Sequence, residues 1–492
     1  MSTLFVDSVE TQQAPGAYVV EIAPPRVIEG LVTGYIGFVF QGEWGPVNTL
    51  SEPGSTPEFM SMYFPPGSPH TSAGYRALMR RKRMPLRPVR IANGAATAAL
   101  TDAAGTGTFT VTAKYPGTLG NSIALTWLAA TDGDAAHRDL VVTLSNAVTG
   151  STTERIRNVV MNVDLNLTGS ALLASLTFAT ASALPAAATT GTLTGGTNGS
   201  AVTSTHYRTA LALLALRSDI FVVVTDDPGD SIRDAVNDEV VAHVASKRDR
   251  LGVIQTTAVN AVWADVKSYV NTHSPTVRND RIIPCGAYVQ ALDDAGAAQT
   301  VPFSTFVASA LANLEPQQSH ARWSEIATQY YDGVAGIVAP FSTDDDDLRG
   351  EATVSGILLP IRLDTGAYAA LHDRTSSLTD GRRFVTTRRL KDFLARSIRT
   401  NIQGFVNGIN WRGQQVKVKG LVDAFLTRQG PSVRRDEPRV VAYSTDINSV
   451  NTPASVAAGN FNLALDATTP SVMEKIGLLF NVGETVSVRE SN

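Results

Sequence analysis

Apolar positions along residues 201–349 follow two alternating spacings. Segments with apolar residues three and four apart predict helices at about 205–217, 230–247, 259–272 and 303–314. Short apolar runs between them, bounded by turn residues, predict strands at 219–225, 251–255 and 281–289. Because such alternation is typical of βαβ units, this part of the chain is predicted to form an α/β sheet that serves as the folding core.

Residues 91–200 have a different pattern. They are rich in Ala, Gly and Thr and hold ten charged residues in 110 positions. Runs typical of β-strands at 107–113 and 121–128 are separated by Gly, Asp and Asn. The pattern predicts a mostly β insert.

A third pattern begins near Gly350. Residues 356–362 are strand-like, 416–428 are helical, and 483–490 could form a terminal strand. Between 387 and 406 one helical face carries the apolar residues Leu390, Phe393, Leu394, Ile398, Ile402 and Phe405. The remaining face is predicted to carry Arg388, Arg389, Lys391, Arg396 and Arg399. Over 374–439, fifteen basic residues stand against five acidic ones, a local charge of +10.

Composition narrows the class of protein. A chain of 492 residues exceeds one ordinary hydrophobic core, and 43% apolar with 17% charged residues excludes disorder of the whole chain. No run approaches the length of a membrane span, and residues 1–16 lack the layout of a signal peptide, so no membrane insertion is expected. The net charge of −4 gives no overall attraction to nucleic acid.

Common catalytic and cofactor motifs are absent from the sequence. The seven histidines never lie three or four apart, and no phosphate loop, dinucleotide-binding glycine triplet or esterase elbow is present. The single cysteine, Cys285, excludes an intrachain disulfide and a multi-cysteine metal site, and it is predicted to be a small strand residue. No cofactor and no metal are therefore predicted.

Two acidic groups are the most enzyme-like features. Asp226 and Asp227 follow the strand at 221–225, and ligands of open α/β sheets bind beyond the carboxyl ends of strands. Asp-Pro-Gly is also ordinary turn chemistry before a helix, which is the favoured interpretation. Asp344 to Asp347 could bind a cation or form a solvated loop, and the loop is favoured.

The basic stretches at 76–90 and 382–399 leave three interpretations open. They could contact phosphate backbone, form a solvated face, or meet an acidic protein partner. They lack interleaved aromatic residues and a nucleic-acid module, so direct nucleic-acid binding is the least favoured.

Four segments, in order, resemble contractile tail sheath proteins of bacteriophages and related injection machines. The first comprises Pro15-Gly-Ala-Tyr-Val-Val-Glu-Ile, then Ile28-Glu-Gly-Leu-Val-Thr-Gly-Tyr-Ile-Gly-Phe-Val-Phe and Gly42-Glu-Trp-Gly-Pro-Val-Asn. The second leads from Gly195-Gly-Thr-Asn-Gly through Tyr207 into Ala210-Leu-Ala-Leu-Leu. The third is Tyr331-Asp-Gly-Val-Ala-Gly-Ile-Val-Ala-Pro-Phe, and the fourth is the helix that begins Thr386-Thr-Arg-Arg-Leu.

The resemblance implies a multidomain α+β and α/β fold with a tail-sheath plan. Its expected parts are an N-terminal extended arm (1–25), the first part of the core (26–90), a mostly β inserted outer domain (91–200), an α/β core (201–349), a C-terminal tube-proximal domain with the Arg-rich helix (350–479) and a C-terminal arm (480–492). Beyond residue 430 the plan differs from the usual one, because some sixty further residues follow the second helix.

The resemblance also implies a structural role without catalysis. The expected subunit polymerises helically around a tail tube and contracts to drive the tube through the host envelope. Expected partners are further copies, the tube protein, and tail terminator and baseplate proteins, in a virion tail assembled in the host cytoplasm. The alternatives are a hydrolase- or transferase-like enzyme using Asp226 and Asp227, or another virion structural protein.

Two sets of residues are expected to make the contacts. Arms that add strands to neighbouring subunits would use Tyr18, Val19, Val20, Ile22, Val486 and Val488. A basic surface toward the tube would use Arg382, Arg383, Arg388, Arg389 and Lys391.

Overall fold

A computed structural model describes most of the chain in two compact units. It covers residues 5–6, 19–20, 34–68, 86–102, 109–147, 149–160, 162–167, 169–179, 185–247, 249–256, 258–259, 261–273, 277–292, 296–323, 329–338 and 346–474. The core unit comprises Val32–Asp392 with Ser471–Asn492, and the terminal unit comprises Met1–Leu31 with Phe393–Pro470. Each unit is described by itself.

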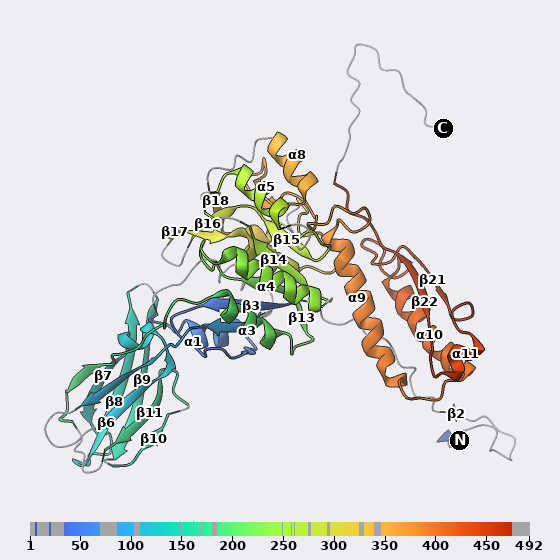
Figure 1. Ribbon diagram of the computed structural model, residues 1–492. Helices are drawn as coiled ribbons and strands as arrows, with labels where there is room; N and C mark the ends of the chain where they lie inside the picture. Colours follow the sequence, from blue (N-terminus) through green and yellow to red (C-terminus); the bar gives the residue numbers. More distant parts are fainter. Residues whose placement is uncertain are drawn as a thin grey trace. The chain divides into compact units, whose positions relative to one another are not determined.

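The core unit contains a five-stranded parallel sheet (Figure 1). Its strands are β3 (Tyr35–Gln41), β4 (Leu86–Ile91), β13 (Ile220–Thr225), β14 (Leu251–Gln255) and β15 (Ile282–Cys285). Their order is β15-β14-β13-β3-β4, with every neighbouring pair parallel. The predicted α/β sheet is confirmed. Strand β4 extends the sheet on one side of β3, and β13, β14 and β15 extend it on the other, so the strand order reverses between β3 and β13.

Helices cover both faces of this sheet. Their bounds are α1 (Thr56–Tyr63), α3 (Ser204–Leu214), α4 (Arg233–Ser246), α5 (Trp263–Thr272) and α6 (Phe303–Asn313). The last four confirm the predicted helices to within a few residues. One buried cluster joins α1 and α6 to alternate strand residues such as Ile36 and Phe38, and a second joins α3, α4 and α5 to Val39 and Val223.

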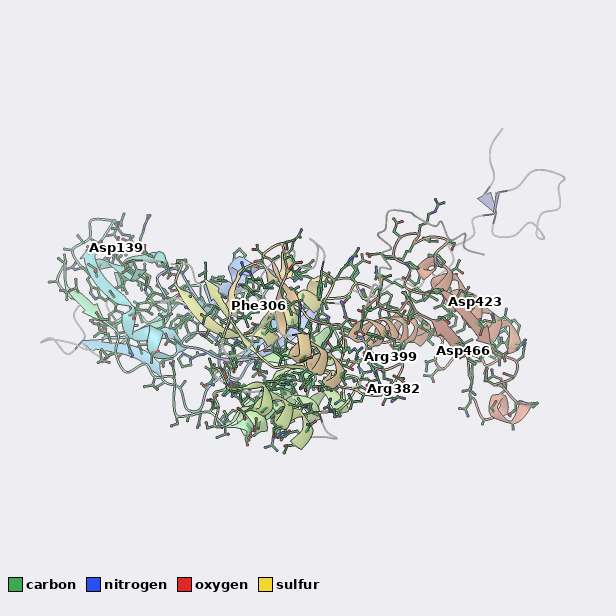
Figure 2. All side chains as sticks on the ribbon, turned by 90° about the horizontal axis from the view of Figure 1, so that it is seen from above. Asp139, Phe306, Arg382, Arg399, Asp423 and Asp466 are labelled. Atoms are coloured by element: carbon green, nitrogen blue, oxygen red, sulfur yellow. The ribbon has the colours of Figure 1, made fainter. Side chains whose placement is uncertain are left out.

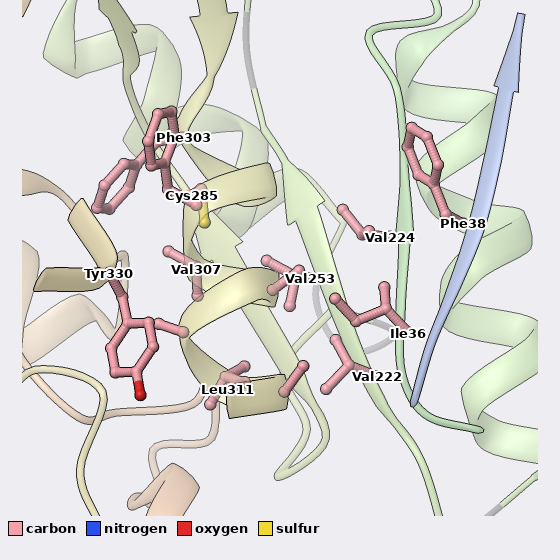
Figure 3. Packing of buried hydrophobic residues seen from close by; sticks show 14 of the residues in the cluster. Ile36, Phe38, Val222, Val224, Val253, Cys285, Phe303, Val307, Leu311 and Tyr330 are labelled. Atoms are coloured by element: carbon pink, nitrogen blue, oxygen red, sulfur yellow. The ribbon is translucent and has the colours of Figure 1, made fainter. Parts of the chain in front are cut away.

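The cluster under α6 gathers alternate residues of the strands, because side chains of a strand alternate between its two faces. Figure 3 shows Ile36, Val222 and Val253 directed toward Val307 and Leu311 of α6. Cys285 is buried in the same cluster as a free thiol, as predicted for a small strand residue.

The strand predicted at 281–289 is in fact two strands. β15 ends at Cys285 in the parallel sheet, and β16 (Tyr288–Leu292) belongs to an antiparallel sheet with β17 (Ala298–Pro302) and β18 (Val334–Ile337). At Gly286, between them, an added Cβ would lie 2.8 Å from Val266 Cγ1 and 2.9 Å from Ile357 Cγ2. Glycine therefore allows the chain to leave one sheet for the next in a crowded place.

Residues 97–192 form two four-stranded antiparallel sheets. One contains β5 (Thr97–Asp102), β6 (Phe109–Pro116), β10 (Leu165–Asn166) and β11 (Leu173–Phe178). The other contains β7 (Ala124–Ala129), β8 (His137–Asn146), β9 (Gly150–Val160) and β12 (Thr190–Thr192). Both contribute to one buried cluster, in which Phe109 meets Trp127 edge to face at 5.2 Å between ring centroids. The short 3-10 helix η2 (Thr118–Ser122) joins β6 to β7.

The core unit is completed by α8 (Asp346–Ser355) and by the hairpin of β19 (Pro360–Arg362) and β20 (Tyr368–Ala370). Because α8 begins at Asp346, the last two of the four consecutive aspartates belong to a helix and not to the predicted loop. Acidic residues stabilise the first turn of a helix, where the backbone amides are unpaired.

The terminal unit is built on two long helices. Helix α9 (Val385–Ile402) begins in the core unit and continues into the terminal unit, followed by η3 (Gln403–Phe405) and α10 (Arg412–Gln429). A two-stranded sheet, β21 (Ala442–Asp446) with β22 (Ala464–Thr468), and the short α11 (Pro453–Ala457) follow. The predicted apolar face of α9 packs through Phe393, Leu394 and Ile398 against α10.

Near the amino terminus, β1 (Phe5–Val6) pairs in parallel with β2 (Val19–Val20). Among the helices that the structure describes, none has the length and apolarity needed to cross a bilayer.

Candidate assembly surface

Asp226 and Asp227 lie at the reversal point of the parallel sheet, where ligands of open α/β sheets commonly bind. Both carboxylates are occupied by donors of the same chain. Asp226 accepts hydrogen bonds from the Tyr207 hydroxyl at 2.8 Å and from the Gln41 amide at 2.6 Å. Asp227 pairs with Arg233 at 3.0 Å and accepts from the Tyr288 hydroxyl at 3.2 Å. These contacts join the ends of neighbouring elements, which is a structural use of the two residues.

The protonation of Asp226 gives the first testable prediction. Burial raises its pKa to about 7, whereas an aspartate in an unfolded chain has a pKa near 3.9. Between these two pKa values the native state keeps a proton that the unfolded state has lost. The stabilisation that protonated Asp226 provides is therefore fully present below about pH 4 and is lost as the pH rises to about 7. Asparagine has no such proton to lose. The free energy of unfolding of Asp226→Asn, measured relative to that of the natural chain, should therefore rise by about 1–3 kcal/mol between pH 4.5 and pH 8. Urea denaturation at both pH values measures this difference, and an unchanged difference would contradict the assignment.

The basic stretch at 76–90 contributes two arginines to the interior, and for these two the prediction of an exposed face or partner interface is wrong. Arg87 pairs with Asp219 at 2.9 Å and lies over the Tyr35 ring. Arg90 is fully buried, where it donates to the carbonyls of Gly42, Gly45 and Pro116 at 2.7–2.8 Å. Residues 76–85 lie outside the described part of the chain.

Arg389 also has an internal role, so its assignment to an exposed basic surface is wrong. Its side chain is 1% exposed and donates to Leu311 O at 2.8 Å, Leu314 O at 2.6 Å and Gln318 O at 3.1 Å. The first two carbonyls lie at the carboxyl end of α6, where backbone acceptors have no partner within the helix. Arg389 thus caps α6 and fixes the start of α9 to the core.

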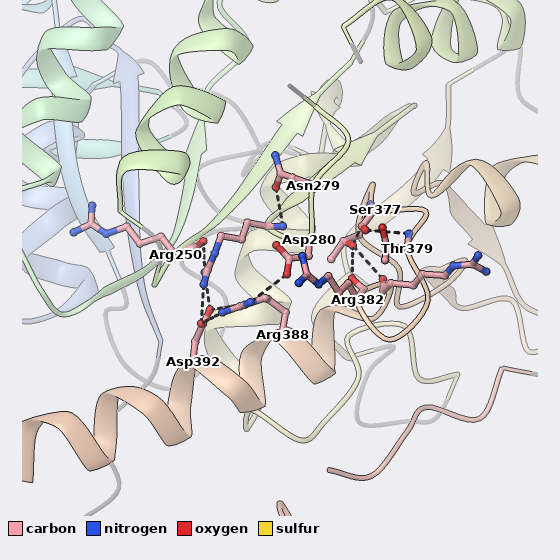
Figure 4. A network of polar contacts seen from close by, with 11 residues as sticks. Arg250, Asn279, Asp280, Ser377, Thr379, Arg382, Arg388 and Asp392 are labelled. Atoms are coloured by element: carbon pink, nitrogen blue, oxygen red, sulfur yellow. Dashed lines mark hydrogen bonds and ion pairs between the residues drawn. The ribbon is translucent and has the colours of Figure 1, made fainter. Parts of the chain in front are cut away.

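Arg388 is used in a charge network between α9 and the core. Asp392 accepts from Arg281 at 2.7 and 2.9 Å and from Arg388 at 2.5 Å. Arg388 also reaches Asp280 at 3.1 Å (Figure 4). Because Asp392 is buried, these two arginines satisfy a carboxylate that would otherwise be costly.

The exposed members of the predicted basic surface are fewer than expected. Arg382 and Lys391 are exposed, and Arg383 is half-buried and pairs with Asp380 at 3.0 Å. Arg399, farther along α9, is also exposed; Figure 2 labels it with Arg382. The charge that remains accessible is therefore spread along α9 and the loop before it.

The two-stranded sheet of the terminal unit has open edges. β21 and β22 pair with each other and with no further strand among the residues described. One face packs on α10, where the Tyr443 hydroxyl donates to Asp423 O at 3.1 Å. Unpaired strand edges offer rows of backbone donors and acceptors, which is the arrangement to which another strand can be added.

The predicted arm residues are largely outside the described residues. Val19 and Val20 form β2 and pair with Phe5 and Val6. Tyr18, Ile22, Val486 and Val488 are not described. Their use between subunits stays a prediction.

Comparison with solved structures shows which proteins have a similar fold. No family model and no curated protein matches the sequence. The structure is similar to a sheath tail protein from Listeria innocua, with a TM-score of 0.61, 16% identity, and coverage of 90% of this chain and 96% of that one. It is similar to a sheath tail protein from Desulfitobacterium hafniense, with a TM-score of 0.65, 15% identity, and coverage of 92% and 100%.

A third similarity is to an assembled particle. The contracted helical sheath of the anti-feeding prophage matches with a TM-score of 0.57, 13% identity, and coverage of 96% of this chain and 99% of that one. The structural neighbours are thus tail sheath proteins of phage-like contractile injection systems, and the chain has their mixed α/β fold with several sheets. The resemblance noted in the sequence is confirmed at the level of the fold.

Proposed function

We propose that the protein is the structural subunit of a contractile tail sheath. It polymerises helically around a tail tube, and the sheath shortens to drive the tube through a host envelope. The observation that supports this most strongly is a shared fold over 90–96% of the chain with sheath proteins, one of them in a contracted helical sheath. The internal bonding of Asp226 and Asp227 disfavours the enzyme alternative.

Strand exchange is the proposed link between subunits. The arms at 1–25 and 480–492 would add strands through Tyr18, Val19, Val20, Ile22, Val486 and Val488 to the open edges of β21 and β22 in neighbours. A two-stranded sheet is marginal by itself, and further strands would stabilise it. Main-chain hydrogen bonds supply most of this affinity, so the arms need extended backbone more than particular side chains.

The remaining proposed contacts concern the tail as a whole. Arg382, Arg383 and Lys391 would meet the tube, and the exposed Arg399 extends this surface along α9. Exposed ion pairs contribute at most about 1 kcal/mol each, which suits a contact that must release during contraction. Terminator and baseplate proteins are the proposed partners at the two ends of the sheath, in a virion tail assembled in the host cytoplasm. Charge reversal at Arg388 or Arg389 would disturb the fold and cannot test this surface.

Removal of the arms tests the proposal. We expect the full chain to form regular hollow tubes in negative-stain electron microscopy, and we expect chains lacking 1–25 or 480–492 to form none. Val19→Pro should also abolish tubes because proline removes a backbone donor, while the matched Val19→Thr keeps the donor and a β-branched side chain and should retain them. Discrete small particles from the full chain under every condition would count against a sheath subunit.

A further inference from the structure

Two helices carry an exposed glycine that the fold of one chain does not explain. At Gly350 in α8 and Gly420 in α10, an added Cβ would meet nothing within 4 Å, and neither backbone has the positive φ that favours glycine. Glycine inside a helix is unfavourable relative to alanine, because it loses more backbone freedom on folding. A glycine that neither packing nor conformation requires is suited to close approach by another backbone.

The exposed face of α8 combines this glycine with acidic and apolar residues. Asp347, Gly350, Glu351 and Val354 follow the three- and four-residue spacing of one helical face, and all four are exposed. Val354 is 71% exposed. Glu351 is engaged with Trp263 at 2.8 Å and Lys267 at 3.1 Å, so Asp347 carries the accessible negative charge of this face.

The exposed face of α10 has the same plan with the opposite charge. Val416, Lys417, Gly420 and Ala424 share one face, and all four are exposed. Val416 is 50% exposed. In both helices a valine lies four residues from the unexplained glycine. On each face the valine side chain therefore projects from the surface one turn away from the gap that the glycine leaves.

We propose that the α8 face of one copy packs against the α10 face of a second copy in the sheath. Val354 would enter the gap at Gly420, Val416 would enter the gap at Gly350, and Asp347 would lie near Lys417. The fit rests on complementary charge and on complementary shape, each drawn from the exposed residues of the two helices. Both helices are labelled in Figure 1.

A contact between two different faces also suits the assembly. A head-to-tail contact of this kind leaves one free face on each end of a pair of copies, so further copies can add. When the rotation between successive copies does not close a ring, the copies continue into an open helical filament. The inference therefore rests on the proposed sheath function and names a surface that strand exchange by the arms does not use.

Disulfide trapping tests the contact. Val354→Cys and Gly420→Cys place thiols at two exposed positions that the proposed contact brings together, as a disulfide requires. The natural Cys285 is buried, so its thiol should not compete. The two single variants, made with tags of different mass, are mixed under conditions of tube formation and oxidised. We expect the disulfide between positions 354 and 420 to form at least about tenfold faster than that of a control pair, because docking raises the effective concentration of the thiols.

The matched control combines Val354→Cys with Thr400→Cys, an exposed position of α9 outside the proposed face. A rate for the 354–420 pair no higher than for this control would overturn the inference. A chain with both Val354→Cys and Gly420→Cys that closes its disulfide internally, at a rate independent of protein concentration, would also overturn it.

Charge exchange separates this inference from the proposed function. Lys417→Glu and Asp347→Lys should each raise the protein concentration needed for tubes by about tenfold, and the double variant should restore assembly. Unimpaired tubes from both single variants would overturn the α8–α10 contact and leave the sheath function standing. Failure of the unmodified chain to form tubes would count against the function, while the trapping rate still decides the contact.

Discussion

Asp392→Ala is expected to lower the free energy of unfolding by about 3–5 kcal/mol, because removal of one partner leaves buried charge uncompensated. Arg281 donates two hydrogen bonds to the Asp392 carboxylate, and its side chain is 11% exposed. Without the carboxylate, the Arg281 guanidinium keeps its charge in a place that water barely reaches. Urea denaturation followed by circular dichroism measures the loss.

Asp380→Ala provides the matched control. Asp380 is also an aspartate paired with an arginine, Arg383, but its side chain is 92% exposed. The loss there should stay below about 1 kcal/mol. Losses of equal size in the two variants would show that burial of the Asp392 network does not matter. Replacing the whole network with Arg281→Met, Arg388→Met and Asp392→Leu should recover most of the stability, because no unpaired buried charge remains.

Arg389→Met is expected to cost about 3 kcal/mol, since three backbone carbonyls lose a buried donor at about 1 kcal/mol each. Methionine keeps the length and the apolar contacts of the arginine stem, so the loss reports mainly the hydrogen bonds. Two of the carbonyls, Leu311 O and Leu314 O, lie at the end of α6. Amide hydrogen exchange in the last turn of α6 should therefore accelerate.

Lys391→Met is the control for this variant. Lys391 lies two residues away on the same helix and is exposed, so its replacement should change stability by no more than about 0.5 kcal/mol. Exchange in α6 that stays unchanged in Arg389→Met, together with a small loss of stability, would contradict the capping role.

The alternating part of the chain could be predicted well from the sequence. Helices α3, α4, α5 and α6 and strands β13 and β14 lie where the apolar spacing places them. The spacing works because each of these elements buries a continuous apolar face, and the faces of a helix and a strand have different periods. The failure at 281–289 has the same basis, since two buried strands separated by Gly286 read as one apolar run.

The sequence contained a signal for the buried position of Arg389, namely its spacing from apolar residues along the helix. Arg389 lies four residues after Val385 and four before Phe393, both of which are buried, so the three share one side of α9. The local excess of basic residues favoured an exposed interpretation instead. For Arg90 no comparable signal exists, because its three acceptors are backbone carbonyls that every residue carries.

The sequence by itself determined helices α3, α4, α5 and α6 and strands β13 and β14 of the α/β core, the apolar face of α9 and the resemblance to sheath proteins. These features depend on residues a few positions apart or on the order of short segments. Only the tertiary structure decided which charges are internal. Arg281 and Asp392 are 111 residues apart, and Arg389 and Leu311 are 78 apart. Folding determines whether a guanidinium contacts water, a carboxylate or the end of a helix. A buried charge without a partner is costly, so each buried arginine lies where the fold supplies acceptors.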